Sequence, residues 1–185
     1  MIRFLAVLLL AAGAAPAMAA PLGPVASCVY ERIPVAERNA LGAAMGSDDP
    51  FPAALDNSFE AHLTACGGRL SASRADIEGA SAEVLSTLYL DTLRPLLRAA
   101  GIAPEALDAW FNGQSEEIRA TYGWPGMSEA QGRAITDNMM ETLAARGIPP
   151  SLVQRHSALV SGYLTASVML FRAQHGLATR IDAAG

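Results

Sequence analysis

The stretch HSALVSGYLTASVMLF, residues 156–171, decides the fold class of this chain. It carries no formal charge when His156 is neutral, so a helix built from it would be apolar on most sides and would need to be buried. It is shorter than the roughly 20 apolar residues that cross a bilayer, and serine, threonine and glycine interrupt it. We therefore expect a buried final helix over residues 150–175, at the centre of a bundle, and no transmembrane helix in the mature chain.

Outward from this stretch, helical periodicity covers nearly all of the chain, and no alternating pattern of a strand is convincing. The chain is 51% hydrophobic but only 6% aromatic, which favours helices packed through small and aliphatic side chains. We expect one all-α domain over residues 34–178, an irregular bundle of five to six helices. The expected helices cover residues 34–45, 52–66, 73–100, 104–122, 128–146 and 150–175.

Two similar sequences predict sharp corners between helices, LRAAGIAP at residues 97–104 and LAARGIPP at residues 143–150. Each has a glycine where a helix needs a left-handed residue after its end, followed by an isoleucine that can contact the leucine before it. A proline then opens the next helix. Inside the longest predicted helix, Pro95 removes a backbone donor, so we expect a kink or break near residues 91–94.

The N-terminus has the three-part pattern of a secretory signal peptide over residues 1–19: Arg3, the apolar run 4–12, and Ala17-Met18-Ala19. This pattern predicts cleavage after Ala19 and export, to the periplasm or, as an alternative, out of the cell. We expect residues 20–33, which hold two prolines, to form an extended N-terminal segment, and residues 179–185 to form a flexible tail.

The two cysteines of the chain, Cys28 and Cys66, predict a disulfide, because an even number in an exported protein is typical of one. Closing this loop would contribute about 3–4 kcal/mol in the chain-entropy view. One alternative is that Val25-Ala26-Ser27-Cys28 is a lipobox, whose cysteine is acylated and anchors an envelope lipoprotein. Another is a metal site with His62, but three or four ligands are not evident, so no metal is predicted.

Sequence motifs for catalysis, nucleotides or cofactors are absent from the chain. The formal net charge is −5, and loss of Arg3 with the signal peptide would make it more negative, so we expect no nucleic-acid partner and no cofactor. Acidic and basic neighbours such as Asp91 and Arg94 have the spacing of ion pairs on a helix surface.

The most distinctive local composition is aromatic, because Trp110, Phe111, Tyr122 and Trp124 lie close together in the sequence, with Met127 just after them. If exposed, these residues would form a binding patch for a protein partner or a small apolar ligand, since tryptophan and tyrosine dominate binding hot spots. The alternative is that they close one end of the bundle.

These observations lead to a noncatalytic exported binding domain as the preferred function. One alternative is an envelope structural or assembly lipoprotein anchored through Cys28. The other is an unrecognised hydrolase, which would require a pocket that holds a histidine together with a carboxylate or a hydroxyl.

Overall fold

Nine helices and no strand form the part of the protein that the computed structural model describes, residues 21–46, 51–123 and 127–177. The all-α prediction is therefore confirmed. The helices are α1 (Pro24–Arg32), α2 (Val35–Met45), α3 (Ala53–Leu70), α4 (Arg74–Ala99), α5 (Pro104–Asn112), α6 (Glu116–Thr121), α7 (Glu129–Ala145), α8 (Pro150–Arg155) and α9 (Ser157–Gln174). The proposed signal peptide and tail lie outside the described residues.

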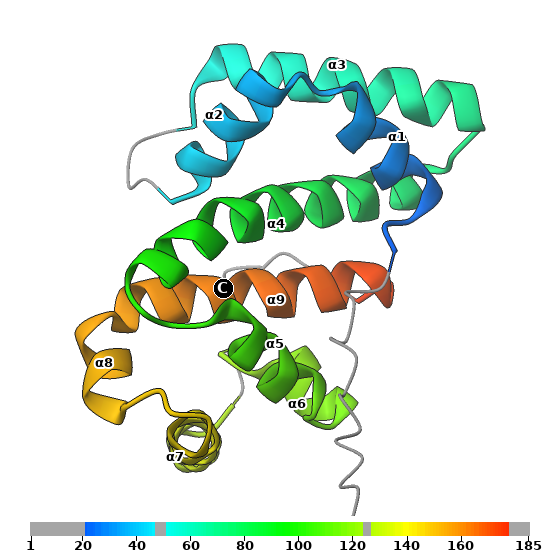
Figure 1. Cartoon of the computed structure of the whole chain (residues 1–185). Helices are drawn as coiled ribbons and strands as arrows, with labels where there is room; N and C mark the ends of the chain where they lie inside the picture. The colour runs from blue at the N-terminus through cyan, green and yellow to red at the C-terminus, as the bar shows by residue number, and fades with distance from the viewer. Residues whose placement is uncertain (1–20, 47–50, 124–126, 178–185) are drawn as a thin grey trace, which may run out of the picture.

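Helix α4 lies in the middle of the molecule and separates two hydrophobic cores. On one side it packs against α1, α2 and α3, and on the other it packs along α9 (Figure 1). The N-terminal core is built around buried side chains such as Val29, Leu41 and Leu63. The C-terminal core joins α4 and α5 to α7, α8 and α9.

The two cores require α4 to be apolar on opposite faces. Ala80, Val84 and Leu88 are four residues apart, so they lie along one face, which packs into the N-terminal core. The face that packs into the C-terminal core carries Leu90, Leu93 and Leu97. Both faces are buried because the tertiary structure places partners on both sides of this helix.

Both glycine corners are confirmed. At the first, the Ile102 amide donates to the Leu97 carbonyl oxygen at 2.9 Å, and Gly101 has φ of +80°. At the second, the Ile148 amide donates to the Leu143 carbonyl oxygen at 3.0 Å. These bonds satisfy carbonyl groups that the helix end would leave without a partner.

Two of the expected long helices are each divided in two. The chain turns at His156, between α8 and α9, so that Val153 can pack into the core beside α7 while α9 packs along α4. A straight helix over residues 150–175 could not make both contacts. Similarly, α5 ends at Asn112, and Ser115 caps the separate helix α6 by accepting a hydrogen bond from the Ile118 amide.

The expectation of an extended segment over residues 20–33 is wrong, because α1 covers Pro24–Arg32. Pro24 occupies the first turn, where a helix does not use the backbone N–H. The buried Glu83 carboxylate accepts a hydrogen bond from the Gly23 amide at 2.8 Å, which places a negative charge at the positive end of α1.

Two helices continue past points where the sequence predicts an end or a break. Helix α3 runs beyond the expected end at residue 66 to Leu70, and it includes Gly67, where a Cβ would lie 2.5 Å from the Ile77 Cδ1 atom. Helix α4 likewise continues through Pro95 to Ala99, so the expected break does not occur.

Helix α9 packs against four helices, α4, α5, α6 and α8, and its buried residues include Tyr163, Leu164 and Phe171. One of its stripes is nevertheless exposed: Ser157, Ala158, Ser161 and Thr165. Gly162 allows α4 to approach closely, because a Cβ there would lie 3.0 Å from the Tyr89 hydroxyl. Within the described ranges, every helix is too short or too polar to cross a bilayer.

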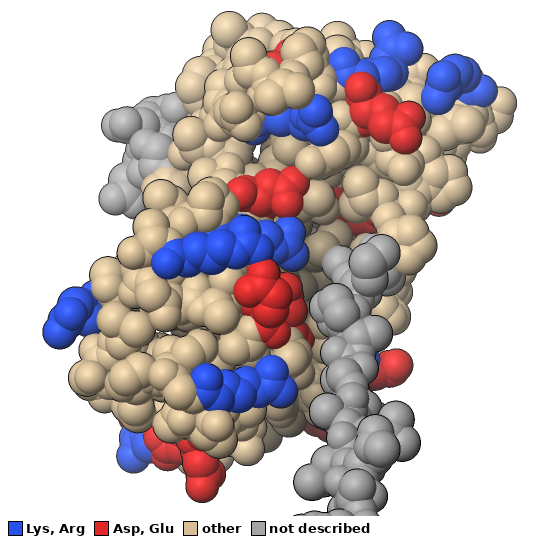
Figure 2. Space-filling view, in the orientation of Figure 1, with Lys and Arg blue, Asp and Glu red and all other residues tan. Residues whose placement is uncertain are grey.

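The surface charges are mixed by sign. On the face shown in Figure 2, acidic and basic side chains alternate instead of gathering into one patch. Ion pairs of this surface include Arg94 with Asp91 at 3.1 Å and Arg94 with Asp108 at 3.7 Å. The predicted Asp91–Arg94 pair is therefore present, and Arg94 also pairs with Asp108 on α5.

Candidate functional site

The first half of α7 holds no fully buried residue, although Ile135 packs against the C-terminal core, and it forms one wall of a groove. Ser128 and Gln131 cap its start reciprocally, with the Ser128 hydroxyl accepting from the Gln131 amide and the Gln131 side chain accepting from the Ser128 amide. The buried residues of α7, Met139 and Leu143, both belong to its second half. The first half is consequently held by its end and by a few side chains.

Aromatic side chains attach α7 to α5. The Trp110 indole Nε1 donates to the Asn138 Oδ1 atom at 3.1 Å. The Trp110 ring meets the Tyr122 ring edge to face, with 5.8 Å between the centroids, and the Tyr122 hydroxyl lies 3.5 Å from the Thr136 hydroxyl. These contacts fix the position of Tyr122 between the two helices.

The groove that results lies between α7 and the exposed stripe of α9, and we call it the α7–α9 groove. Its volume is about 610 Å³, which is within the range of roughly 300–1,000 Å³ found for sites of small molecules. Eleven residues line it: Tyr122, Gly123, Met127, Ser128, Glu129, Gly132, Arg133, Thr136, Asp137, Ser161 and Thr165. The groove thus combines an aromatic ring, a thioether, hydroxyl groups and charges.

The two walls differ in the state of their hydroxyl groups. On α7, the Thr136 hydroxyl donates to the Gly132 carbonyl oxygen at 2.9 Å, so its proton is already used. On α9, Ser161 and Thr165 are exposed, and neither hydroxyl makes a hydrogen bond within the described part of the chain. Both hydroxyl groups are therefore available to a molecule in the groove.

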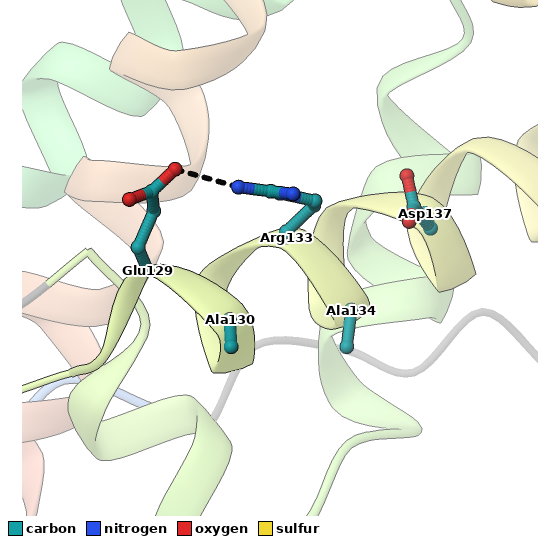
Figure 3. Close-up of a pocket in the computed structure, with 5 residues that line it drawn as sticks. All are labelled: Glu129, Ala130, Arg133, Ala134 and Asp137. Carbon is teal, nitrogen blue, oxygen red and sulfur yellow. Dashed lines mark hydrogen bonds and ion pairs between the residues drawn. The ribbon is translucent and has the colours of Figure 1, made fainter.

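The charges of the groove come from α7. Arg133 donates to Glu129 at 2.6 Å, one helical turn away, and Figure 3 shows the two side chains reaching toward each other. Asp137 is exposed and makes no hydrogen bond or ion pair with any described residue. A second depression, of about 470 Å³, runs along α7 alone and shares these three charged residues with the groove.

The aromatic residues predicted to form a binding patch are divided by the structure. Trp110 and Phe111 are only 2% and 7% exposed, so they belong to the C-terminal core, as the alternative interpretation expected. Tyr122 and Met127 are half-buried and line the α7–α9 groove. Trp124 lies outside the described residues.

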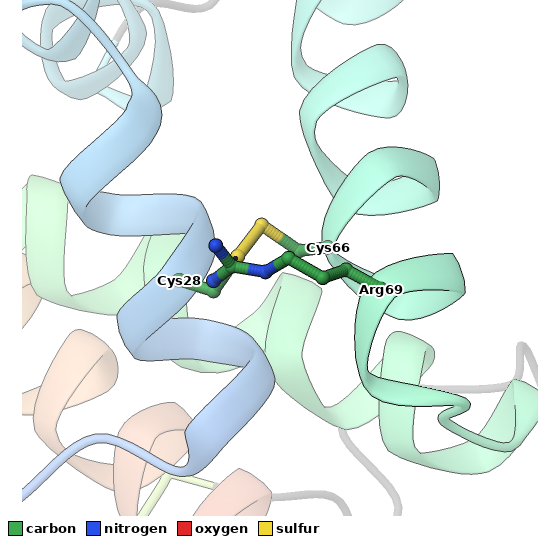
Figure 4. Close-up of a disulfide and its surroundings, with 3 residues drawn as sticks. All are labelled: Cys28, Cys66 and Arg69. Carbon is green, nitrogen blue, oxygen red and sulfur yellow. Dashed lines mark hydrogen bonds between the residues drawn. A yellow bond between two sulfur atoms is a disulfide. The ribbon is translucent and has the colours of Figure 1, made fainter.

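The cysteines form the predicted disulfide, with 6.0 Å between the Cα atoms of Cys28 and Cys66. Both residues are buried, and the bond joins α1 to α3 (Figure 4). The Arg69 guanidinium lies across it and donates to the Cys28 Sγ atom at 3.0 Å. His62, the other residue of the metal-site alternative, instead lies 3.7 Å from a Glu37 carboxylate oxygen.

Sequence reasoning missed most of the groove. Ser161 and Thr165 belong to the uncharged stretch 156–171, which predicts a buried central helix and not the wall of a site. Asp137 and Arg133 resemble ordinary charges of a helix surface, and only the position of α9 beside them makes them part of a concave site. Their spacing in the sequence carries no signal that could have distinguished them from other surface charges.

Comparison of the chain with models of protein families, with curated proteins and with solved structures finds no match. The function must therefore be argued from the groove itself.

Proposed function

We propose that this protein is a noncatalytic exported binding domain that holds a small organic ligand in the α7–α9 groove. The observation that carries the proposal is the groove itself, about 610 Å³ in volume and lined by an aromatic ring, a thioether and unused hydroxyl groups. A site of this size and composition can contact the apolar part of a small molecule and orient its polar part.

Export is part of the proposal and rests on two features. The first is the signal-peptide pattern of residues 1–19. The second is the buried disulfide between Cys28 and Cys66, which is compatible with an oxidising compartment such as the periplasm.

A small ligand fits the groove better than a protein partner that docks on exposed aromatic residues. Two members of the predicted aromatic patch, Trp110 and Phe111, are buried and cannot act as anchors at an interface. Tyr122 and Met127 instead face a concave space, where they can contact a molecule of limited size.

The two alternatives gain no comparable support. A sulfur atom in the disulfide cannot also carry an acyl chain, so lipid anchoring through Cys28 would need the Cys28–Cys66 bond to be absent. The hydrolase alternative requires a histidine in the pocket, and the residues that line the α7–α9 groove do not include one.

The experiment is to map the binding of aromatic fragments by two-dimensional NMR of the ¹⁵N-labelled protein from residue 20 onward. We expect the largest shifts at amides of the groove, such as Tyr122, Asp137 and Ser161. A tyrosine at Ser161 would fill the groove, so Ser161→Tyr should abolish these shifts.

Ser157→Tyr is the matched control, because Ser157 is an exposed serine one turn earlier on α9 and does not line the groove. It should leave the binding of the fragments intact. The proposal is wrong if the fragments shift amides outside the groove only, or if both variants behave alike.

A further inference from the structure

We infer that the ligand of the α7–α9 groove is an organic cation, an ammonium group attached to an apolar or aromatic body. The inference rests on the proposed function and adds the chemical class of the ligand. It follows from the charge of the lining residues and from the hydroxyl groups that line the same groove.

The groove has a surplus of negative charge. Glu129 and Asp137 contribute two carboxylates, and Arg133 contributes the only guanidinium among the lining residues. Arg133 is already bound to Glu129 at 2.6 Å, so its charge is balanced within α7. Asp137 has no partner among the described residues, and a cation in the groove would balance it.

The opposite wall can complete the coordination of an ammonium group. An ammonium group has only donors, and the free hydroxyl oxygens of Ser161 and Thr165 can accept from it. An anionic ligand would instead meet the Asp137 carboxylate without a free basic group to offset it.

The apolar part of the ligand can contact Tyr122 and Met127, which also line the groove. The Tyr122 ring is held by its edge-to-face contact with Trp110, so it can act as a rigid wall. Aromatic faces attract cations, and thioethers adapt to apolar groups of varied shape. A cation with an aromatic body therefore matches both the polar and the apolar parts of the lining.

The test compares three probes that share one ring: 2-phenylethylammonium, the neutral 2-phenylethanol and the anionic 3-phenylpropionate. Affinities are measured by NMR titration at low salt, from the amide shifts of the groove. We expect the cation to bind about threefold more tightly than the alcohol, the size of effect that an exposed ion pair provides. The anion should bind most weakly, and the preference should shrink as salt screens the charges.

Asp137→Asn should remove the preference for the cation and leave the affinity for 2-phenylethanol unchanged. Glu141→Gln is the matched control, because it removes one negative charge from an exposed position one turn further along α7, outside the groove. It should keep the preference, which separates a local ion pair from a general attraction of cations to an acidic protein.

The outcomes separate the two proposals. If the cation and the alcohol bind the groove equally, or if Asp137→Asn leaves the preference in place, the inference of a cationic ligand is overturned and the groove remains a binding site. If none of the three probes shifts the amides of the groove, both the inference and the proposed small-molecule site are contradicted.

Discussion

At the scale of single residues, a chain of polar contacts crosses the molecule and links both halves. The Tyr30 hydroxyl on α1 donates to Asp91 on α4 at 2.8 Å. Arg94 then pairs with Asp91 and with Asp108 of α5. Finally, the hydroxyl of the buried Tyr163 on α9 donates to Asp108 at 2.7 Å. The Asp91–Arg94 pair, which the sequence predicts as an ion pair on a helix surface, therefore forms the middle of a longer network.

Tyr163 makes this network sensitive to alkaline pH. Burial, and then the hydrogen bond to the Asp108 carboxylate, raises the pKa of the Tyr163 hydroxyl above the ordinary tyrosine value of about 10. Because the folded pKa is the higher one, this contribution to stability is complete below about pH 10 and is lost as the pH rises through the folded value.

We predict that Tyr163→Phe lowers the free energy of unfolding by about 1–2 kcal/mol at pH 8, because a hydrogen bond to a charged acceptor is lost. The difference in the free energy of unfolding between this variant and the unmodified protein should become smaller above about pH 10. Urea unfolding of both proteins at pH 8 and at pH 11 measures this difference. Tyr30→Phe, which loses a hydrogen bond to the exposed Asp91, should lower the free energy of unfolding by less. If the difference between Tyr163→Phe and the unmodified protein instead increased with pH, the role given to the Tyr163 hydroxyl would be contradicted.

At the scale of elements, the close approach of α2 to α4 depends on a glycine. A Cβ at Gly42 would lie 2.1 Å from the Thr92 hydroxyl oxygen and 2.8 Å from the Leu88 carbonyl oxygen. The hydroxyl could rotate away, but the carbonyl belongs to the backbone of α4 and cannot. Helix propensity favours alanine at this position, so tertiary packing explains why glycine is present.

We predict that Gly42→Ala destabilises the protein by about 1–3 kcal/mol, because α2 must move away from α4. The matched control is Gly79→Ala on α4, where a Cβ would meet no atom within 4 Å. That variant should stabilise the protein by about 0.5–1 kcal/mol through helix propensity. Thermal unfolding of both variants measures the two changes in stability. If Gly42→Ala and Gly79→Ala changed the stability equally, the close contact of α2 with α4 at Gly42 would not explain why glycine is present there.

At the scale of the whole molecule, the two cores are stabilised differently. The N-terminal core contains the Cys28–Cys66 disulfide, which ties α1 to α3. The C-terminal core has no such bond and depends on the apolar faces of α4, α5, α7, α8 and α9. The partly buried Leu22 packs against both cores, next to the point where Glu83 binds the start of α1.

We predict that loss of the disulfide in a Cys28→Ala, Cys66→Ala double variant costs about 3–4 kcal/mol. Hydrogen exchange should accelerate most in α1 to α3 and least in α9, because the bond lies in the N-terminal core. Exchange by mass spectrometry on the oxidised protein and the double variant tests this. Uniform acceleration over all nine described helices would mean that the two cores open as one unit.

The sequence by itself determined the all-α class, the pairing of Cys28 with Cys66, and the two glycine corners. The helices and their corners depend on local chemistry, either 3.6-residue periodicity or a left-handed glycine at a helix end. Such signals are complete within a few residues, except for the disulfide, which followed from there being only two cysteines.

Only the tertiary structure decided which faces are buried and where a site can form. It turned the chain at His156 and buried two faces of α4. It also left Ser161 and Thr165 exposed, where they line the same groove as Asp137. A concave surface arises from the relative position of helices that are distant in sequence, and no local pattern encodes that position. The groove could therefore be found only after the helices were placed in space.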